Sequence, residues 1–387
     1  MRRIYLDYTA TTPLDPQVFE AMKPYFLEKF GNPSSIHKFG QEAKAAIEES
    51  RTIIAKHIGA QPAEVVFVSS GTESDNYAIK GAALKMREAG KTHIITTKIE
   101  HQAVLETCDN LAEHGVTITF LNVDKDGIVD PENVRQAITP KTGLISVMFA
   151  NNEVGSINPI SEIGAIAKEN KILFHTDAVQ ALGKIKIDVN ELNIDLLSVT
   201  AHKLYGPKGI GAIYVRKGVE LEKLLHGGGQ ERGKRASTES TPLIVGFAKA
   251  TEIASNIMEQ EWVRLADLKL YLKSKIENKY PFVIFNGHPK QSLSNILNVS
   301  FDSSRINIDG EALILSMDLE GVAITSGSAC TSGSVKPSHV LLAMGRDVET
   351  AKASIRFSMG RSTTIEDLDY ALNILEKVIA RIGKRNK

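Results

Sequence analysis

The chain of 387 residues contains 42% hydrophobic and 24% charged residues, which is the balance of a globular protein. A chain of this length is longer than a domain with one hydrophobic core usually is, so we expect two or three structural units. Lys plus Arg equals Asp plus Glu at 46 each, and this balance excludes the basic excess typical of proteins that bind nucleic acid directly.

The first residues, MRRIYLDYTATTP, contain two arginines that no apolar stretch follows, so we expect no signal peptide. No apolar run of about eighteen residues occurs, so we expect no membrane association through a spanning helix. The two cysteines, Cys108 and Cys330, lie in unlike contexts. We therefore expect no disulfide framework, and we expect a cytoplasmic location.

Short β-branched runs alternate with helical patterns from about residue 40 to residue 215. In the first helical pattern Ala43, Ile47, Ile54 and Ile58 fall on one face, which predicts a helix packed by that face. The alternation predicts an α/β domain with a mostly parallel sheet, whose ligands bind beyond the carboxyl ends of the strands. The predicted strands are Val65–Val68, His93–Thr97, Val116–Leu121, Leu144–Phe149, Ile172–His175, Leu196–Val199 and Gly211–Val215.

The pattern changes after about residue 240. Two long helical patterns, roughly Leu243–Gln260 and Trp262–Lys279, lead into a unit of strands and helices that we interpret as a smaller domain. We expect a large domain at residues 16–255 and a small domain made of residues 1–15 and 256–387. The segments of the small unit are Leu293–Phe301, Leu313–Met317, Ala353–Ser358 and a last helix from about Ile365 to Ile382.

The common nucleotide and metal motifs are incomplete or absent. Gly228–Lys234 matches the start of a phosphate-binding loop, but Arg235 stands where such a loop needs Ser or Thr for magnesium. ATP binding is therefore not expected. No HExxH and no paired CxxC occurs, so no dedicated metal site is expected either.

Two segments place polar residues where predicted strands end. In Val68–Asn76, VSSGTESDN, Gly71 lets the backbone turn closely and Thr72 can cap a helix whose N-terminus would favour a phosphate. A helix cap without a ligand is the alternative. Asp177 ends another apolar strand, where a carboxylate needs a partner.

Lys203 follows the next apolar strand directly after Thr-Ala-His. A lysine in a half-buried cleft can lose its proton and attack a carbonyl, whereas a surface lysine before a turn is the alternative. Cys330 lies among small polar residues, TSGSACTSGS, which favours a nucleophilic thiolate over a buried structural cysteine. Cys108 lies in a helical pattern between Val104 and Leu111 and is predicted to be a packing residue.

The order of these motifs resembles the class V aminotransferases, a branch of fold-type I pyridoxal-phosphate (PLP) enzymes, and within them the cysteine desulfurases of the NifS and IscS type. The resemblance covers nearly the whole chain and implies a mostly parallel seven-stranded sheet with a smaller α/β C-terminal domain. The matching segments are Gly31–Gly40, Val68–Asn76, Glu100 with His101, Asn151–Gly155, His175–Gln180, Ala201–Gly209, His226–Gly233, Ser326–Cys330 and Arg356–Arg361.

The resemblance implies a role for each matching residue. Lys203 would hold PLP covalently, Asp177 would pair with the ring nitrogen, Gln180 would hydrogen-bond the ring hydroxyl, and His101 would stack on the ring and move protons. Thr238 would reach the phosphate in a neighbouring subunit, which implies a homodimer. The implied cofactor-binding residues are Gly71, Thr72, His101, Asp177, Gln180, Thr200, His202, Lys203 and Thr238.

The implied reaction converts L-cysteine to L-alanine, with Cys330, Lys203 and His101 as catalytic residues. Asn152 and Arg356 would bind the substrate carboxylate, with Arg361 as the competing candidate, because the guanidinium fork meets both carboxylate oxygens. A persulfide on Cys330 would pass to an acceptor protein for iron–sulfur cluster assembly or thiolation. The alternatives are a selenocysteine lyase or other PLP-dependent β-lyase, which need not use Cys330, and a catalytically silent PLP-binding partner.

The chain departs from the family pattern at two places. Tyr8 and Thr9 stand where the family usually has Asn and Ala, in a segment that lies near the substrate in relatives. Ser237 and Ser240 flank Thr238 where Gly and Asn are common, and Ser adopts the backbone angles of Gly less easily. We therefore expect local differences in substrate fit and in the contact between subunits.

Overall fold

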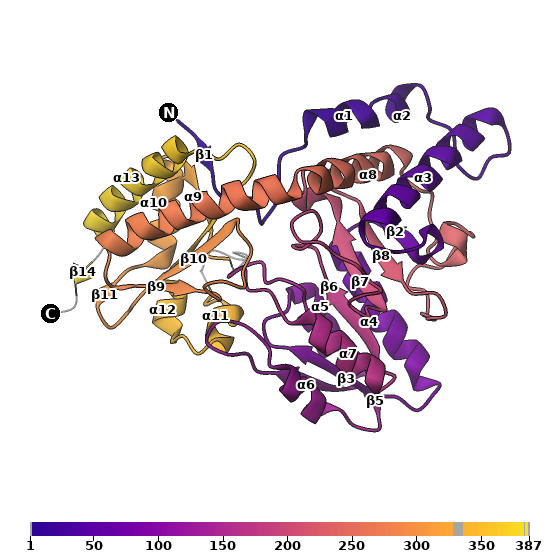
Figure 1. The fold of residues 1–387 in the computed structure, drawn as a ribbon, viewed down its shortest axis with the longest axis horizontal. Coiled ribbons are helices and arrows are strands. Elements are labelled where there is room, and N and C mark those ends of the chain that lie inside the picture. The colour runs from indigo at the N-terminus through magenta and orange to yellow at the C-terminus, as the bar shows by residue number, and fades with distance from the viewer. Residues whose placement is uncertain (1, 328–335, 383, 386–387) are drawn as a thin grey trace.

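The computed structural model describes residues 2–327 and 336–382, together with the backbone of residues 384–385. Two bodies lie side by side, and the long helix α9 (Met258–Lys279) runs from one to the other (Figure 1). The larger body is a sheet between two layers of helices, and the smaller one packs helices against short strands, most of which pair antiparallel.

The sheet of the larger body has seven strands in the order β2-β8-β7-β6-β5-β3-β4. Strand β8 is antiparallel to β2 and β7, and the other neighbouring pairs are parallel. The predicted mostly parallel seven-stranded sheet is thus confirmed. The strands are β2 Val65–Val68, β3 His93–Thr97, β4 Thr117–Leu121, β5 Thr142–Ser146, β6 Leu173–Asp177, β7 Leu196–Thr200 and β8 Gly211–Val215.

Apolar residues on both faces hold this sheet between its helices. Because successive side chains of a strand point to opposite faces, Val65 and Phe67 of β2 enter one core and Val66 and Val68 another. The predicted helical face of Ala43, Ile47, Ile54 and Ile58 is buried as expected. The helices of this body are α1 Pro16–Met22, α2 Pro24–Leu27, α3 Lys38–His57, α4 Gly71–Arg87, α5 Gln102–Glu113, α6 Pro131–Ala137, α7 Ile160–Glu169 and α8 Thr241–Asn256, with short 3-10 turns η1 Pro62–Glu64, η2 Ala201–Lys203 and η3 Glu231–Gly233.

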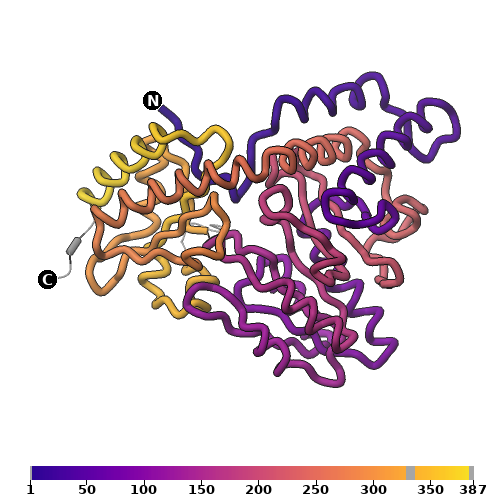
Figure 2. The backbone as a smooth tube through the Cα atoms, viewed as in Figure 1, coloured from indigo at the N-terminus to yellow at the C-terminus, as the bar shows by residue number. Residues whose placement is uncertain are grey.

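The smaller body has its own apolar core, and the start of the chain belongs to it. Ile4 and Leu6 lie in the same apolar core as Leu368 and Leu375 of α13 (Ile365–Ile382), beside which the first residues run (Figure 2). This core supports the predicted division into domains, which stays a prediction. The remaining elements are β1 Ile4–Tyr5, β9 Val283–Asn286, β10 Ile296–Phe301, β11 Ile306–Asn307, α10 Gly310–Leu319, β12 Val322–Ala323, α11 His339–Ala343, α12 Val348–Lys352, β13 Ser354–Ser358 and β14 Lys384–Arg385.

The junction between the two long helices differs from the prediction. The sequence placed it near residue 261, whereas α8 ends at Asn256 and α9 begins at Met258. Ile257 has φ −108° and ψ 5°, which interrupts the helical path. Neither Gly nor Pro marks this position, so local sequence signals could not locate it.

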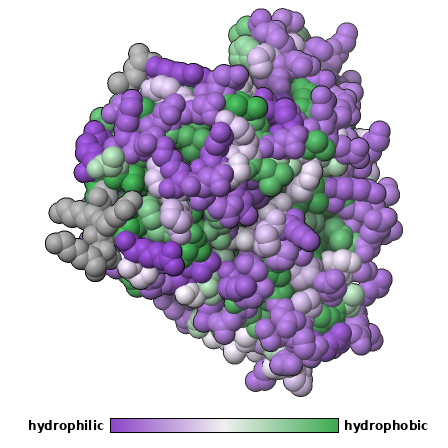
Figure 3. Space-filling model, turned by 60° about the vertical axis from the view of Figure 1, so that its left-hand side comes forward, coloured by the Kyte–Doolittle hydropathy of each residue, from purple (hydrophilic) through white to green (hydrophobic). Residues whose placement is uncertain are grey.

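The face of the molecule in Figure 3 is mainly hydrophilic, with hydrophobic residues in scattered patches. Exposed apolar side chains of the smaller body include Leu315 and Leu319 on α10. Among the described residues, no helix combines the length and the apolar character needed to cross a membrane.

A buried ion pair attaches the segment before Thr238 to the edge of the sheet. Arg51 of α3 donates from Nη1 and Nη2 to the two carboxylate oxygens of Glu231, at 2.7 and 2.9 Å. The same carboxylate accepts the backbone N–H of Phe67 at 2.8 Å, and the guanidinium lies over the Phe67 ring. Glu231 and Arg232 both have positive φ. The ion pair therefore fixes a strained turn that leads towards Thr238.

Replacing Glu231 with Gln should remove the buried carboxylate that pairs with Arg51, and it should leave the partly exposed Glu48 as the remaining acidic partner of Arg51. We expect the free energy of unfolding to fall by about 3 kcal/mol, measured by chemical denaturation. The control is Glu169→Gln, whose partner Arg135 is exposed, and this change should cost less than about 1 kcal/mol. Equal losses in the two variants would contradict the proposed importance of the buried pair.

Candidate active site

The carboxyl ends of β2, β6 and β7 meet at one edge of the sheet. Strand β6 ends at Asp177, and β7 leads into the turn η2 that contains Lys203. Strand β2 leads to Ser70 at the start of α4. Because these strands point the same way, their following residues gather in one place, as ligand-binding residues do in such sheets.

A cavity of about 330 Å³ lies at this edge. The structure brings into its wall every residue that the sequence predicted for the site, apart from Thr238 and Cys330. Thr238 is exposed elsewhere on the surface. Cys330 lies outside the described residues, although Thr325 and Gly327 before it line the cavity. The predicted residues in the wall are Gly71, Thr72, His101, Asn152, Asp177, Gln180, Thr200, His202, Lys203 and Arg356.

Lys203 is held by the start of the chain. Its Nζ donates to the backbone carbonyls of Thr9 and Ala10 at 2.6 and 2.7 Å. Burial, assisted by the charge of Arg356, lowers the pKa of Lys203 to about 8 against the opposing effect of Asp177. Near neutral pH, a larger share of Lys203 is therefore in the neutral, nucleophilic form than for an ordinary lysine.

Three buried carboxyl groups influence one another beside Lys203. Burial raises the pKa of Glu100 to about 8, and burial with the charge of Asp177 raises that of Asp75 well above its usual range. Burial also raises the pKa of Asp177, but His101 and Lys203 oppose this effect. His101 and Lys203 favour the charged form of Asp177, so Asp177 is the one best suited to pair with a cationic ring nitrogen.

The N-terminus of α4 forms part of the cavity wall. The prediction that Thr72 caps this helix was wrong: Ser70 is the cap, and its Oγ accepts the N–H of Glu73 at 3.1 Å. Gly71 fits tightly, since a Cβ there would lie 2.9 Å from Val179 Cγ2. Thr72 remains exposed towards the cavity, in the first turn of the helix. The backbone N–H groups and the helix dipole at this end suit a phosphate.

Thr200 and His202, two further residues predicted for the site, also line the cavity. Thr200 donates its hydroxyl to the carbonyl of Ile210 at 3.0 Å, so it would have to rotate to donate to a ligand. Burial, with the charge of Lys203, lowers the pKa of His202 to about 4, so its ring is neutral at physiological pH.

His101 is the N-cap residue of α5. Its Nδ1 accepts the backbone N–H of Ala103 at 3.1 Å, so Nε2 carries the hydrogen of the neutral ring. Burial lowers the pKa of His101, which favours this neutral form. His101 therefore offers the cavity a flat, neutral imidazole in a fixed orientation.

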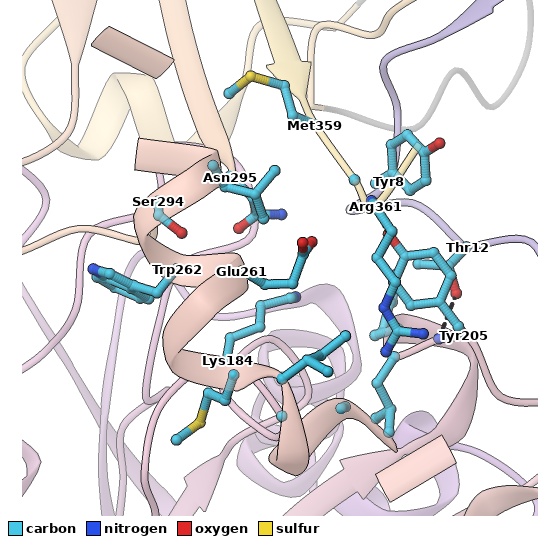
Figure 4. A pocket seen from close by; sticks show the side chains of 18 residues that line it. Tyr8, Thr12, Lys184, Tyr205, Glu261, Trp262, Ser294, Asn295, Met359 and Arg361 are labelled. Atoms are coloured by element: carbon cyan, nitrogen blue, oxygen red, sulfur yellow. Dashed lines mark hydrogen bonds between the residues drawn. The ribbon is translucent and has the colours of Figure 1, made fainter. Parts of the chain in front are cut away.

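The structure separates the two candidate arginines. Arg356 of β13 lines the cavity, donates from Nη2 to Asp7 Oδ1 at 2.8 Å and from Nη1 to the carbonyl of Asn152 at 2.8 Å. Arg361 instead pairs with Asp15 and stacks on Tyr205, beside a neighbouring cavity of about 60 Å³ (Figure 4). Arg356 is therefore the arginine that lies with Asp177 and Lys203.

The sequence analysis missed Lys184. Its Nζ donates to Gln180 Oε1 at 2.8 Å, and burial lowers its pKa to about 7. Lys184 also lines the neighbouring cavity in Figure 4. A lysine in the mainly apolar segment ALGKIKI was the only local signal. Its contact with Gln180 depends on the turn after β6, which the sequence does not reveal.

The two departures from the family pattern have different consequences. Thr9 holds Lys203 and Gln180 through its backbone carbonyl, a group that any residue supplies. Ser237 has φ 101°, a conformation that favours glycine, so its backbone is strained next to Thr238.

Cys108 is confirmed as a packing residue. It is fully buried in α5 within an apolar cluster, and burial raises its pKa to about 12. Its thiol therefore stays protonated and inaccessible at neutral pH.

Comparisons with known proteins show likeness over almost the whole chain. The family model Aminotransferase class-V matches residues 4–371. The cysteine desulfurase IscS of Dictyoglomus turgidum is 52% identical over 381 residues, covering 98% of this chain and 95% of that protein. A solved NifS-like protein has a TM-score of 0.91 at 39% identity, covering 98% of this chain and 100% of its own. A structure of SspA in complex with cysteine has a TM-score of 0.81 at 41% identity, covering 92% of this chain and 99% of its own.

The environment of Lys203 predicts an unusual pH profile for its chemical modification. In the cofactor-free protein, reductive methylation of Lys203 should become half-maximal near pH 8, because the neutral amine that reacts predominates above its pKa. The reaction of a lysine in a model peptide should be half-maximal at about pH 10.4. Peptide mass spectrometry across a pH series measures both.

Asp177→Asn removes a charge that raises the pKa of Lys203, so it should move the midpoint to lower pH. A midpoint for Lys203 equal to that of the model peptide would contradict this description of the site.

Proposed function

Because the chain belongs to the class-V aminotransferase family and is a PLP-dependent cysteine desulfurase, we propose that Lys203, Asp177 and Cys330 are its central functional residues. The observation that supports this assignment is the single cavity that joins Lys203 and Asp177 with a helix N-terminus and Arg356. The fold agrees, since the expected fold-type I architecture is confirmed by the sheet and by the NifS-like structure.

The residues of the cavity fit PLP. Lys203 would bind it covalently, Asp177 would pair with its ring nitrogen, and Gln180 and His101 would contact its ring. Ser70 and Thr72, with His202 and Thr200, would receive its phosphate at the N-terminus of α4. When bound, PLP withdraws electrons from the α-carbon of an attached amino acid.

Arg356 and Asn152 are the proposed partners of the carboxylate of L-cysteine. The guanidinium is bound to Asp7 on one side, so the substrate carboxylate would share or replace that contact. The neutral amine of Lys203 can then take the α-proton at Nζ. His101 offers Nε2 as a second group for proton transfer from a fixed orientation.

The thiolate of Cys330 is the proposed sulfur acceptor. It attacks the sulfur of the substrate, a new S–S bond forms, and the electron pair of the broken C–S bond goes to the substrate carbon. That carbon gains a proton, and L-alanine is released. One cysteine and one protein thiol thus become one alanine and one protein persulfide. An acceptor protein then takes the outer sulfur for iron–sulfur cluster assembly or thiolation.

We also propose that the active form is a homodimer. Thr238 is exposed in the single chain, as a residue that reaches a second subunit must be. The segment from α2 to the start of α3 exposes several large apolar side chains, and such a patch is typical of an interface. These residues are Phe26, Leu27, Phe30, Ile36 and Phe39. The cytoplasmic location stays a prediction.

The role of Cys330 predicts a selective loss of activity. Cys330→Ser should retain the absorbance of bound PLP and the affinity for L-cysteine, because Lys203 and Asp177 are unchanged. It should release almost no alanine, because no thiol accepts the sulfur. Alanine formation and absorbance spectra measure the two effects.

Cys108→Ser is the control, and it should desulfurate cysteine at close to the parental rate. If Cys330→Ser does so as well, the persulfide mechanism is wrong and a β-lyase that needs no cysteine is favoured. Borohydride reduction should attach PLP to Lys203, and attachment to another lysine would contradict the cofactor assignment.

If the active form is a homodimer, a charge placed on the exposed apolar segment from α2 to the start of α3 should disrupt the dimer. Ile36→Asp should shift the mass in light scattering from dimer towards monomer, because Ile36 is 92% exposed in the single chain. Leu319→Asp replaces an equally apolar, exposed residue of the smaller domain and should leave the dimer intact. A monomeric parent protein with full activity would rule out the proposed assembly.

A further inference from the structure

The turn Asn151–Gly155 lies between the two domains and is held firmly. The side chain of Asn151 accepts the backbone N–H groups of Glu153 and Val154 at 2.8 and 3.0 Å and donates to the carbonyl of Ile99 at 2.9 Å. On the other side, Asn298 of β10 donates to the carbonyl of Glu153 at 3.2 Å. The backbone of Glu153 is therefore fixed by both domains.

The side chain of Glu153 is buried, with only 3% of its surface exposed. Its Oε2 accepts the hydroxyl of Ser338 at 2.5 Å. Gly327 lies against the same carboxyl group, since a Cβ added to Gly327 would lie 2.8 Å from Oε2. One carboxyl group thus contacts the chain just before and shortly after residues 328–335, which contain Cys330.

The same turn also contacts the residues proposed to bind substrate. Asn152 lines the cavity, and its carbonyl accepts Arg356 Nη1. The backbone N–H of Arg356 in turn donates to the carbonyl of Thr325 at 2.6 Å, two positions before Gly327 in the chain. The turn therefore connects the proposed carboxylate site with both ends of the segment that contains Cys330.

Glu153 itself does not line the cavity. Burial raises its pKa, while Ser338, His339 and Arg356 act in the opposite direction. The hydroxyl of Ser338 and the close packing of Gly327 hold the buried carboxyl group of Glu153 in one place. Glu153 can thus influence the reaction through the residues that it contacts, Gly327 and Ser338.

We propose that Glu153 is a positioning residue for sulfur transfer, which fixes Gly327 and Ser338 relative to Arg356 and thereby sets where the Cys330 segment begins and ends. The proposal rests on the proposed function, because it concerns the step in which Cys330 accepts sulfur. It predicts a defect in persulfide formation without a defect in the proton transfer that precedes it.

The test separates these two steps in the PLP-loaded protein. Exchange of the α-proton of L-alanine in deuterated water, followed by NMR, needs Lys203 but not Cys330. Single-turnover persulfide formation on Cys330, followed by mass spectrometry, needs both. Glu153→Ala and Ser338→Ala should slow persulfide formation by roughly tenfold to a hundredfold, while proton exchange stays within about twofold of the parent. Glu153→Gln should restore most of the rate, because its amide oxygen can still accept the Ser338 hydroxyl.

Asp347→Ala is the matched control for Ser338→Ala. Both changes remove the N-cap of a short neighbouring helix, but only Ser338 contacts Glu153. Asp347→Ala should form persulfide at the parental rate. If Glu153→Ala fails to fold, the comparison of Ser338→Ala with Asp347→Ala carries the test.

The proposal is overturned if Glu153→Ala or Ser338→Ala forms persulfide at the parental rate. It is also overturned if proton exchange and persulfide formation fall together, since a general structural role would affect both. Parent protein that forms no persulfide on Cys330 would instead overturn the proposed function, and with it this inference.

Discussion

The burial of Asp177 and Lys203 in one cavity is the constraint on which the rest of the site depends. Asp177 is the last residue of β6, where it pairs in register with Ser198 of the parallel strand β7, and Lys203 lies in the turn that follows β7. A carboxylate and an amine are costly to bury alone, so each shifts the pKa of the other towards its charged form while burial acts against both. The apolar cores on the two faces of the sheet maintain this balance, because they fix the strands.

The cavity is complete only when distant parts of the chain meet. The first residues supply the carbonyls of Thr9 and Ala10 for Lys203, and Asp7 for Arg356. Arg356 itself comes from β13 of the smaller body. The proposed binding of the cofactor and of the substrate carboxylate therefore depends on how the two bodies pack, and the turn Asn151–Gly155 lies where they meet.

Periodicity and strand ends predicted the architecture well, because they reflect local physical requirements. The sheet, the buried face of α3 and the positions of Asp177 and Lys203 after apolar strands all followed from patterns in the sequence. The specific roles of His101, Gln180 and Asn152 came from the resemblance alone. Ser70 as the cap has a local signal, since Ser70 and Glu73 have the spacing of a capping box. Ile257 as the helix break and the contacts of Lys184 and Glu153 were not predictable, because each depends on neighbours that are distant in sequence or on backbone angles without a Gly or Pro signal.

One isotope experiment tests the account most directly. The protein is given L-cysteine with a heavy sulfur isotope for a single turnover, and its peptides are then analysed by mass spectrometry. The account predicts one heavy sulfur on the peptide that contains Cys330, an equal amount of alanine, and no label on the peptide that contains Cys108. Heavy sulfide released to solution while the Cys330 peptide stays unlabelled would contradict it.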